Sequence, residues 1–470
     1  MLDFKNLKYS ELKEKMVYQI QNYNIDYDEQ EKDDMYIDNF YRTEIKKNFR
    51  LPITYLSDKY EIQENIKTDL ELCNKNNLYN YVCNPTTKIA EFTTEYWNKY
   101  YTCNTTFLKD SIDLLKNYKC LPNNLFTLNQ DKSSIKNKEI VDDVFDKWTE
   151  IKSDTGFADK YGYMNWKHLN WLNKSSIFLE ISSMYNFLSP LISLVIPIIL
   201  LLIPFFLLKM KKIKITLNQY IETLKKVGKN NVLIKMFNFK NEPMDKKMYL
   251  ICAVLFYLFQ MYQNTLICFR FYFNLKSIHK FLFSLQEYLN ISLKELSNFS
   301  RYTHNLVTYD NFTIDLNKNK QILSDIHSKL TKITPFTLSV KKTFDIGYVL
   351  KIFYEINYNE TVTNSMLYLF GFNGYLENFS NMQLNLNNKL LNTCTYTNKK
   401  TLIKNGYYPT LIHSNPVKNN ISLKNNIIIT GPNAAGKTTL LKSSLFNVIL
   451  SQQIGCGFYK TAKINPYHYI

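Results

Sequence analysis

The sequence predicts a mostly α-helical protein with an incomplete α/β domain at its C-terminal end and one or two membrane-embedded helices. Three observations lead to this fold class. An uncharged, strongly apolar run lies between Glu180 and Lys209. A leucine-rich stripe with helical spacing follows at 275–296. A short β-branched run then leads into a glycine-containing loop and an amphipathic helix at 427–449.

The length of 470 residues is that of about three domains. Hydrophobic residues make up 45% and charged residues 21%, which is enough for a sizeable core and excludes a wholly disordered chain. Eight cysteines are too sparse for a disulfide scaffold. Residues 1–180 contain four of them at spacings that match no metal-ligand pattern. We therefore expect a mostly helical N-terminal domain of unassigned role.

The net charge of +17 favours a nucleic-acid partner. Only four of the 58 basic residues are arginines, however: Arg42, Arg50, Arg270 and Arg301. Abundant Lys, Asn, Ile, Tyr and Phe together are typical of AT-rich coding sequence, so we interpret most of the excess charge as solvated surface. Because arginine is the usual bidentate reader of bases, any DNA binding is expected to be non-specific and strongly salt-dependent.

Glycines are concentrated near the C-terminal end, where four of the eleven lie within 27 residues. Glycine is needed where the backbone adopts positive φ or approaches a ligand closely. The segment GPNAAGKT at 431–438 fits the phosphate-loop pattern of P-loop nucleotide-binding proteins at every fixed position. Ile427–Ile429 is predicted as the buried strand before this loop, and apolar residues at 440–449 mark the helix after it.

The roles of these residues follow from the chemistry of the motif. Backbone N–H groups of 434–438 are expected to form an anion nest at the helix N-terminus. Lys437 would reach the β- and γ-phosphates of ATP, and the Thr438 hydroxyl would ligate Mg²⁺. No catalytic residue is assigned. The predicted nucleotide-binding residues are Gly431, Asn433, Ala434, Ala435, Gly436, Lys437, Thr438 and Thr439.

The flanks of the loop extend this motif. The run TGPNAAGKTTLLK at 430–442 is followed by QIGC at 453–456, and YPTLIH at 408–413 and NPVKN at 415–419 precede it. Over roughly 400–470 the chain resembles the N-terminal part of the ATPase domain of the MutS family. This resemblance implies an ATP-binding clamp that recognises mismatched DNA in mismatch repair, with ATP held across a dimer of ATPase domains.

The chain also departs from that family. The family's mismatch reader is a Phe-x-Glu wedge near the N-terminus, and the first 170 residues contain none. Its soluble repair proteins also lack membrane spans. One alternative function is therefore a membrane-tethered, MutS-derived ATPase or scaffold that does not read DNA. Another is an inactive interaction protein.

The 33 residues after Lys437 contain neither Asp nor Glu. P-loop ATPases need an acidic strand end, the Walker B motif, to hold Mg²⁺ and activate the attacking water. We expect this motif and the family's signature loop to lie in the rest of a truncated or split chain. The 470-residue chain alone is accordingly expected to be incompetent in ATP hydrolysis and to need a dimer or partner chain that completes the domain.

The first predicted membrane segment is 187–208, FLSPLISLVIPIILLLIPFFLL. About 20 apolar residues suffice to cross about 30 Å of hydrocarbon. Three interior prolines disfavour the alternative of a soluble core helix and fit either a kinked span or a re-entrant hairpin. Residues 248–269 are a possible second membrane segment, for which an amphipathic or buried helix is the alternative.

The connector at 209–248 carries 11 Lys and three acids, and its charge predicts a cytosolic location. Two full spans would then place everything after residue 270 outside, although the predicted ATPase region should face the cytoplasm. Either one segment does not cross or the charge rule is violated. Residues 270–395 are predicted as a helical, lever-like region, with a long amphipathic helix at 275–296 and a second helix at 317–333 that can pack antiparallel to it.

Overall fold

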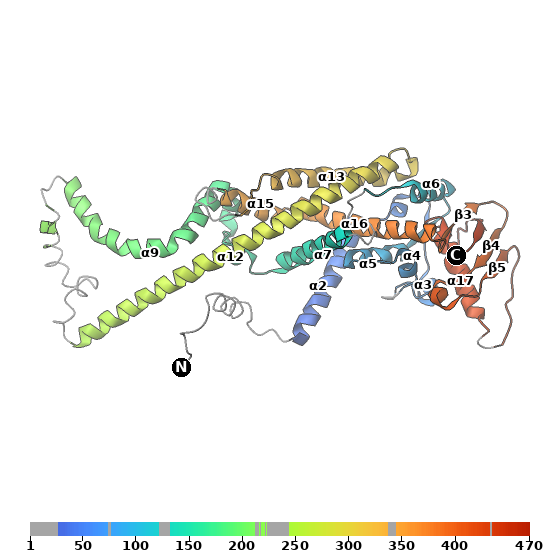
Figure 1. Ribbon diagram of the computed structural model, residues 1–470, viewed down its shortest axis with the longest axis horizontal. Coiled ribbons are helices and arrows are strands. Elements are labelled where there is room, and N and C mark those ends of the chain that lie inside the picture. The colour runs from blue at the N-terminus through green and yellow to red at the C-terminus, as the bar shows by residue number, and fades with distance from the viewer. Residues whose placement is uncertain are drawn as a thin grey trace. The chain divides into compact units, whose positions relative to one another are not determined.

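The computed structural model is mostly helical, with a mixed sheet near the C-terminal end (Figure 1), which confirms the coarse fold class. Contacts group the chain into two compact units. Unit 1 comprises residues 1–153, 287–327 and 360–470, and unit 2 comprises 154–286 and 328–359. The structure describes residues 27–73, 77–121, 132–211, 216, 218–220, 222, 244–336, 345–432 and 435–470.

Unit 1 is built around α16 (Glu360–Asn387), which is buried along most of its length. Its apolar residues are not confined to one face, as expected for a helix that is enclosed on all sides. The helices that contact it include α2 (Tyr27–Asn48), α4 (Tyr79–Cys83), α5 (Lys88–Thr94) and α6 (Thr105–Asn117). The same unit contains η1 (Pro52–Tyr55), β1 (Lys59–Glu61), α3 (Glu64–Asp69), η2 (Glu95–Asn98), β2 (Tyr100–Thr102) and α7 (Lys132–Ser153).

Buried polar side chains of α16 orient the helices around it. The Glu377 carboxylate accepts hydrogen bonds from the Thr86 N–H (2.7 Å) and the Thr87 hydroxyl (2.6 Å), just before α5 begins. The Asn378 amide donates to the Ala90 carbonyl within α5 (2.9 Å). Because a buried polar group costs free energy unless it is paired, these bonds select one rotation of α16 against α5.

The leucine-rich stripe predicted at 275–296 lies in α12 (Met244–Thr303), and its six apolar side chains are buried. After η6 (Val307–Tyr309), α13 (Asp310–Leu330) folds back along the end of α12. The Thr313 hydroxyl donates to that of Thr303 (2.9 Å), and the Ser300 hydroxyl donates to the Asn317 amide oxygen (3.1 Å). The later residue of α12, Thr303, bonds to the earlier residue of α13, Thr313, and the earlier Ser300 bonds to the later Asn317. The two helices are therefore antiparallel, as predicted.

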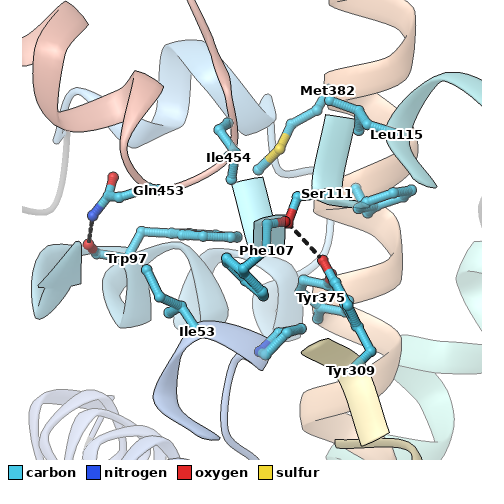
Figure 2. A pocket seen from close by; sticks show the side chains of 12 residues that line it. Ile53, Trp97, Phe107, Ser111, Leu115, Tyr309, Tyr375, Met382, Gln453 and Ile454 are labelled. Atoms are coloured by element: carbon cyan, nitrogen blue, oxygen red, sulfur yellow. Dashed lines mark hydrogen bonds between the residues drawn. The ribbon is translucent and has the colours of Figure 1, made fainter. Parts of the chain in front are cut away.

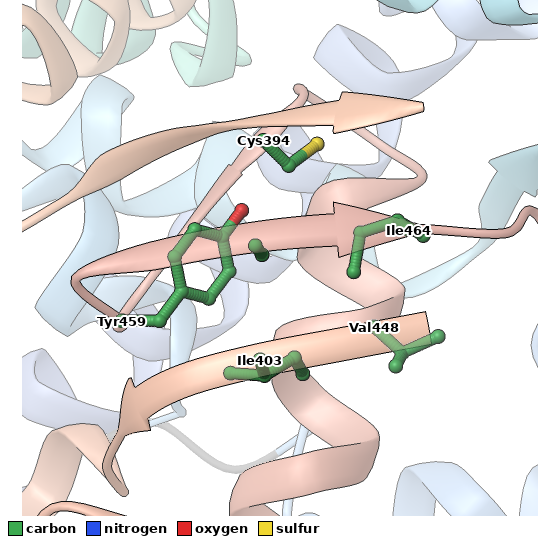
Figure 3. Packing of buried hydrophobic residues seen from close by; sticks show 6 residues of the cluster. Cys394, Ile403, Val448, Tyr459 and Ile464 are labelled. Carbon is green, nitrogen blue, oxygen red and sulfur yellow. The ribbon is translucent and has the colours of Figure 1, made fainter. Parts of the chain in front are cut away.

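The C-terminal sheet has the strand order β5-β4-β7-β3-β6. β3 runs parallel to β7, whereas the other neighbours are antiparallel. Helix α17 (Lys437–Ser451) packs on the sheet through Val448, which lies among Ile403, Tyr459 and Ile464 (Figure 3). The other elements are β3 (Asn392–Tyr396), β4 (Thr401–Gly406), η7 (Pro409–Ser414), β5 (Asn419–Leu423), β6 (Cys456–Gly457) and β7 (Thr461–Ile464).

The prediction of a buried strand at Ile427–Ile429 is wrong. This segment follows β5 in an irregular conformation, and Ile428 is 89% exposed. A strand is held in place by hydrogen bonds to neighbouring strands, and no strand in the described ranges pairs with this segment. β-Branched side chains alone do not fix an extended backbone when such neighbours are missing.

Unit 2 contains two helices that are long and apolar enough to cross a membrane. α9 (Ser176–Met210) includes all of 187–208, and the N-terminal part of α12 includes 248–269. α9 is a continuous, curved helix (Figure 1), because its prolines remove backbone hydrogen bonds and bend the helix without ending it. Most of the predicted connector lies outside the described residues. Unit 2 also contains α8 (Phe157–Tyr161), η3 (Lys167–Lys174) and α15 (Ile346–Tyr358).

Replacing Gly374 of α16 by alanine tests the close packing in unit 1. An added methyl group would lie 2.6 Å from the Ile89 carbonyl oxygen, so the backbone has to move. We expect Gly374→Ala to lower the free energy of unfolding by about 1–3 kcal/mol, measured by denaturant titration in detergent. Gly156→Ala is the control, because its nearest neighbour lies at 3.4 Å. Equal stability of the two variants would contradict the packing.

Candidate functional site

The predicted phosphate loop leads directly into α17. Gly436 is the N-cap of this helix and has a φ of 79°, a left-handed conformation that favours glycine. Ala435, Lys437, Thr438 and Thr439 lie beside it at the same helix end. The first N–H groups of a helix have no intrahelical partner and carry positive potential, so this end can bind an anion. Asn433 and Ala434 lie outside the described residues.

The side chain of Lys437 folds back over the loop, and its ammonium group donates to the Gly431 carbonyl. A methyl group added at Gly431 would make an ordinary van der Waals contact with Lys437 Cδ, at 3.8 Å. The loop therefore brings its first glycine and its lysine together, although they are six residues apart. An ammonium group held only by a carbonyl is available to a phosphate, which offers a stronger, charge-assisted bond.

A cavity of about 330 Å³ opens beside this loop, within the range of small-molecule sites. Ala435, Gly436, Lys437 and Thr439 form one wall of it. The opposite wall comes from the segment between β4 and β5, through Tyr407, Tyr408, Leu411 and Val417, and from Asn419 at the start of β5. Thr438, the predicted metal ligand, does not line this cavity. It lines a separate, largely apolar cavity of about 550 Å³ along the other side of α17.

Ser443 is a residue of this site that the motif did not identify. It lines the 330 Å³ cavity, it is 3% exposed, and its hydroxyl has no hydrogen-bond partner in the described structure. An unpaired buried hydroxyl costs about 1–3 kcal/mol, which a ligand or water in the cavity would offset. The helical spacing in the sequence could have identified this residue, because Ser443 follows Thr439 by four residues and so lies on the same face of the helix.

Asn447 holds the two walls of the cavity in register. Its amide nitrogen donates to the Ser443 carbonyl in α17 (2.9 Å) and to the Tyr407 carbonyl on the opposite wall (3.3 Å). Its amide oxygen accepts from the Phe458 N–H (2.6 Å). Asn447 is fully buried, so these bonds form without competition from water. One side chain thus joins the helix, the opposite wall and the β6–β7 connection.

The C-terminal end of α17 is attached to α4, η2 and β2 of unit 1 by Gln453, the second of two buried glutamines at 452–453. Its amide nitrogen donates to the carbonyls of Trp97 (2.5 Å) and Tyr100 (2.8 Å), and its amide oxygen accepts from the Tyr79 hydroxyl (3.0 Å). Figure 2 shows the Gln453 amide directed at Trp97 beside a small buried cavity of about 20 Å³. Burial raises the pKa of Tyr79, which keeps its hydroxyl a donor.

Gln452 adds a second set of bonds at the same point. Its side-chain amide nitrogen donates to the carbonyls of Thr102 (3.1 Å) and Tyr467 (2.9 Å). Its backbone carbonyl accepts from the Thr102 N–H (3.0 Å). We call these two side chains, Gln452 and Gln453, the glutamine clamp. The clamp fixes α17 at the end opposite to the loop.

Replacing Gln453 by alanine tests the clamp. The change removes three buried hydrogen bonds, although the Tyr79 hydroxyl keeps its bond to the Trp97 carbonyl (3.0 Å), so we expect a loss of about 1–3 kcal/mol in the free energy of unfolding. Tryptophan fluorescence during denaturant unfolding of the solubilised chain measures it. Gln63→Ala, at an exposed position, should change stability by less than about 0.5 kcal/mol. A similarly small effect of Gln453→Ala would mean that the clamp does not hold α17.

Comparison with known proteins assigns no family. No protein-family model matches the chain, and no curated protein matches it. Nor do the described residues contain a group of three or more His, Cys, Asp or Glu side chains that could hold a metal ion. The resemblance of the 400–470 region to MutS ATPases therefore rests on its motifs, and a nucleotide is a proposal for this site.

Proposed function

We propose that this chain is a membrane-tethered protein that binds the phosphates of Mg-ATP at the loop Gly431–Thr439. The observation that carries the proposal is the arrangement at the start of α17. Gly436 caps the helix with a positive φ, Lys437 folds back onto Gly431, and a 330 Å³ cavity lies alongside. Helix-terminal N–H groups, an adjacent ammonium and a cavity of this size together suit a nucleotide.

The residues of the site have different roles in the proposed binding of Mg-ATP. The N–H groups of the loop and of the first turn of α17 bind phosphate oxygens, and Lys437 neutralises their charge. Thr438, in the first turn of α17, would supply a hydroxyl ligand to Mg²⁺ after its side chain turns from the neighbouring cavity toward the loop. The wall that contains Tyr408 and Val417 leaves space for the sugar and base.

The membrane part of the proposal rests on the exposed apolar surface of α9 and α12. In α12, none of the most apolar 18-residue stretch is buried within the protein. In α9, 17% of the corresponding stretch is buried. A core helix would bury most of such a stretch. Contiguous apolar surface of this extent marks an interaction site, and hydrocarbon is the partner that fits uncharged helices of this length.

Duplex DNA is a second candidate ligand, favoured by the net charge of +17. Mismatch recognition comes from the family resemblance alone, and a membrane-tethered ATP-binding protein that does not read DNA is the function we favour. If DNA binds, lysine contacts to phosphates should make the affinity fall steeply with salt, with at most a few-fold preference for a mismatch. A strong mismatch preference at physiological salt, measured by filter binding, would favour the repair function instead.

The nucleotide proposal is tested with Lys437→Ala. Loss of the ammonium removes a charge-assisted bond to phosphate, so labelling of the full chain by 8-azido-ATP should fall about tenfold or more. Lys442→Ala is the matched control, because Lys442 lies one turn later and its ammonium points to Glu71 Oε1 (3.7 Å). Unchanged labelling of Lys437→Ala, or an equal loss in both variants, would refute the assignment.

Membrane integration is tested by extraction at alkaline pH. Burial of apolar side chains contributes about 0.8 kcal/mol per CH₂ group, so the intact chain should stay in the pellet after carbonate treatment. Deletion of both apolar segments, 187–208 and 248–269, should release the chain, whereas Lys437→Ala should sediment like the intact chain. Recovery of the intact chain in the supernatant would contradict an integral segment.

A further inference from the structure

We propose that α9 and the N-terminal part of α12 cross a lipid bilayer as a two-span hairpin. The polypeptide before α9 and after residue 270 then emerges on one face, and the connector at 209–248 lies alone on the other. The proposal rests on the proposed nucleotide site only for its orientation, because ATP is supplied on the cytoplasmic face. The crossing itself rests on the geometry of unit 2.

Contacts between the two helices establish their antiparallel pairing. The rings of Phe187 and Phe271 lie 5.1 Å apart between centroids. Further along α9, the Ser189 hydroxyl donates to the Asn264 carbonyl (3.4 Å). Still further, the Ser193 carbonyl accepts from the Tyr257 hydroxyl (3.0 Å). Later residues of α9 therefore contact earlier residues of α12, so the two helices are antiparallel and residues 187 and 271 lie at the same end of the hairpin.

The surfaces that point away from this seam are apolar on both helices. The exposed large hydrophobic residues of α9 include Leu188, Leu191, Leu194, Val195, Ile199, Leu202, Ile203, Phe206 and Leu207. Those of α12 include Ile251, Leu255, Phe256, Leu258, Phe259, Tyr262 and Ile267. Such surface on two paired helices cannot remain in water. A lipid bilayer would cover the exposed apolar side chains of both helices on every side that faces away from the seam.

Two boundaries separate this apolar zone from water. On α12, the 22 uncharged residues between Lys247 and Arg270 span about 33 Å at about 1.5 Å per residue, close to the roughly 30 Å of hydrocarbon. At the end where α9 begins, Trp166 and Trp171 are 71% and 64% exposed. Exposed tryptophans are typical of membrane–water interfaces. At the other end, Lys209 places its ammonium group at the aqueous boundary.

An even number of crossings returns the chain to its starting face. This removes the conflict between two spans and a cytoplasmic nucleotide site, because the connector is then the only part that is translocated. The eleven lysines of the connector act against this orientation. The experiment therefore has to measure crossing and orientation separately.

N-linked glycosylation during synthesis of the full chain with sealed microsomes makes both measurements. The connector has no Asn-x-Ser/Thr acceptor, and Leu233→Thr creates one at Asn231. We expect this variant to gain one glycan, seen as a mobility shift that endoglycosidase reverses. Asn231→Gln combined with Leu233→Thr should remove the shift. The native acceptors lie before α9, as at Asn104 and Asn173, or after residue 270, as at Asn290 and Asn420. They should all stay unmodified, and their glycosylation would overturn the proposed orientation.

Trypsin added outside the same microsomes provides the second readout. If the hairpin crosses, a fragment that contains α9, the connector and α12 survives, despite the eleven lysines of the connector. Cleavage within the connector, with no glycan on Leu233→Thr and none on the native acceptors, would show that the hairpin does not cross and would overturn the proposal. Carbonate extraction and 8-azido-ATP labelling are unaffected by that outcome, so failure of the topology is distinct from failure of the proposed function.

Discussion

The glutamine clamp is the constraint on which the position of the phosphate loop depends. Gln452 and Gln453 bind backbone carbonyls of Trp97, Tyr100 and Thr102, so the C-terminal end of α17 is fixed to η2 and β2 of unit 1. A helix of 15 residues is about 22 Å long and stiff. Fixing one end therefore sets where the other end points, and that end holds Gly436 and Lys437.

The two sides of the candidate site differ in how firmly they are held. The α17 side is anchored by the clamp and by the packing of Val448 on the sheet. Asn447 extends this order to Tyr407 on the opposite wall. The segment Ile427–Ile429, which leads into the loop, has no strand beside it, and Ile428 is exposed. A ligand at the loop thus has a rigid helix end to bind, and it bears the entropic cost of ordering the chain that enters the loop.

Local sequence patterns predicted the features that depend on local chemistry. The stripe at 275–296, both long apolar helices and the start of α17 follow from spacing and composition. The strand predicted at Ile427–Ile429 failed because a strand depends on neighbours that no local pattern reports. The sequence marks Tyr408 and Val417 only as flanks of the motif, and not as site residues, because only the tertiary fold brings them to the loop. The grouping of 1–153 with 360–470 likewise follows from long-range packing on α16.

Hydrogen–deuterium exchange of the full chain in lipid vesicles, with and without Mg-ATP, tests the central claim most directly. The account predicts that nucleotide slows exchange of the amides at 431–440, because phosphate oxygens accept hydrogen bonds from the loop and the first turn of α17. It also predicts slow exchange in the apolar parts of α9 and α12 with or without nucleotide, because hydrocarbon excludes water from them. Unchanged exchange at 431–440 in saturating Mg-ATP would contradict the account.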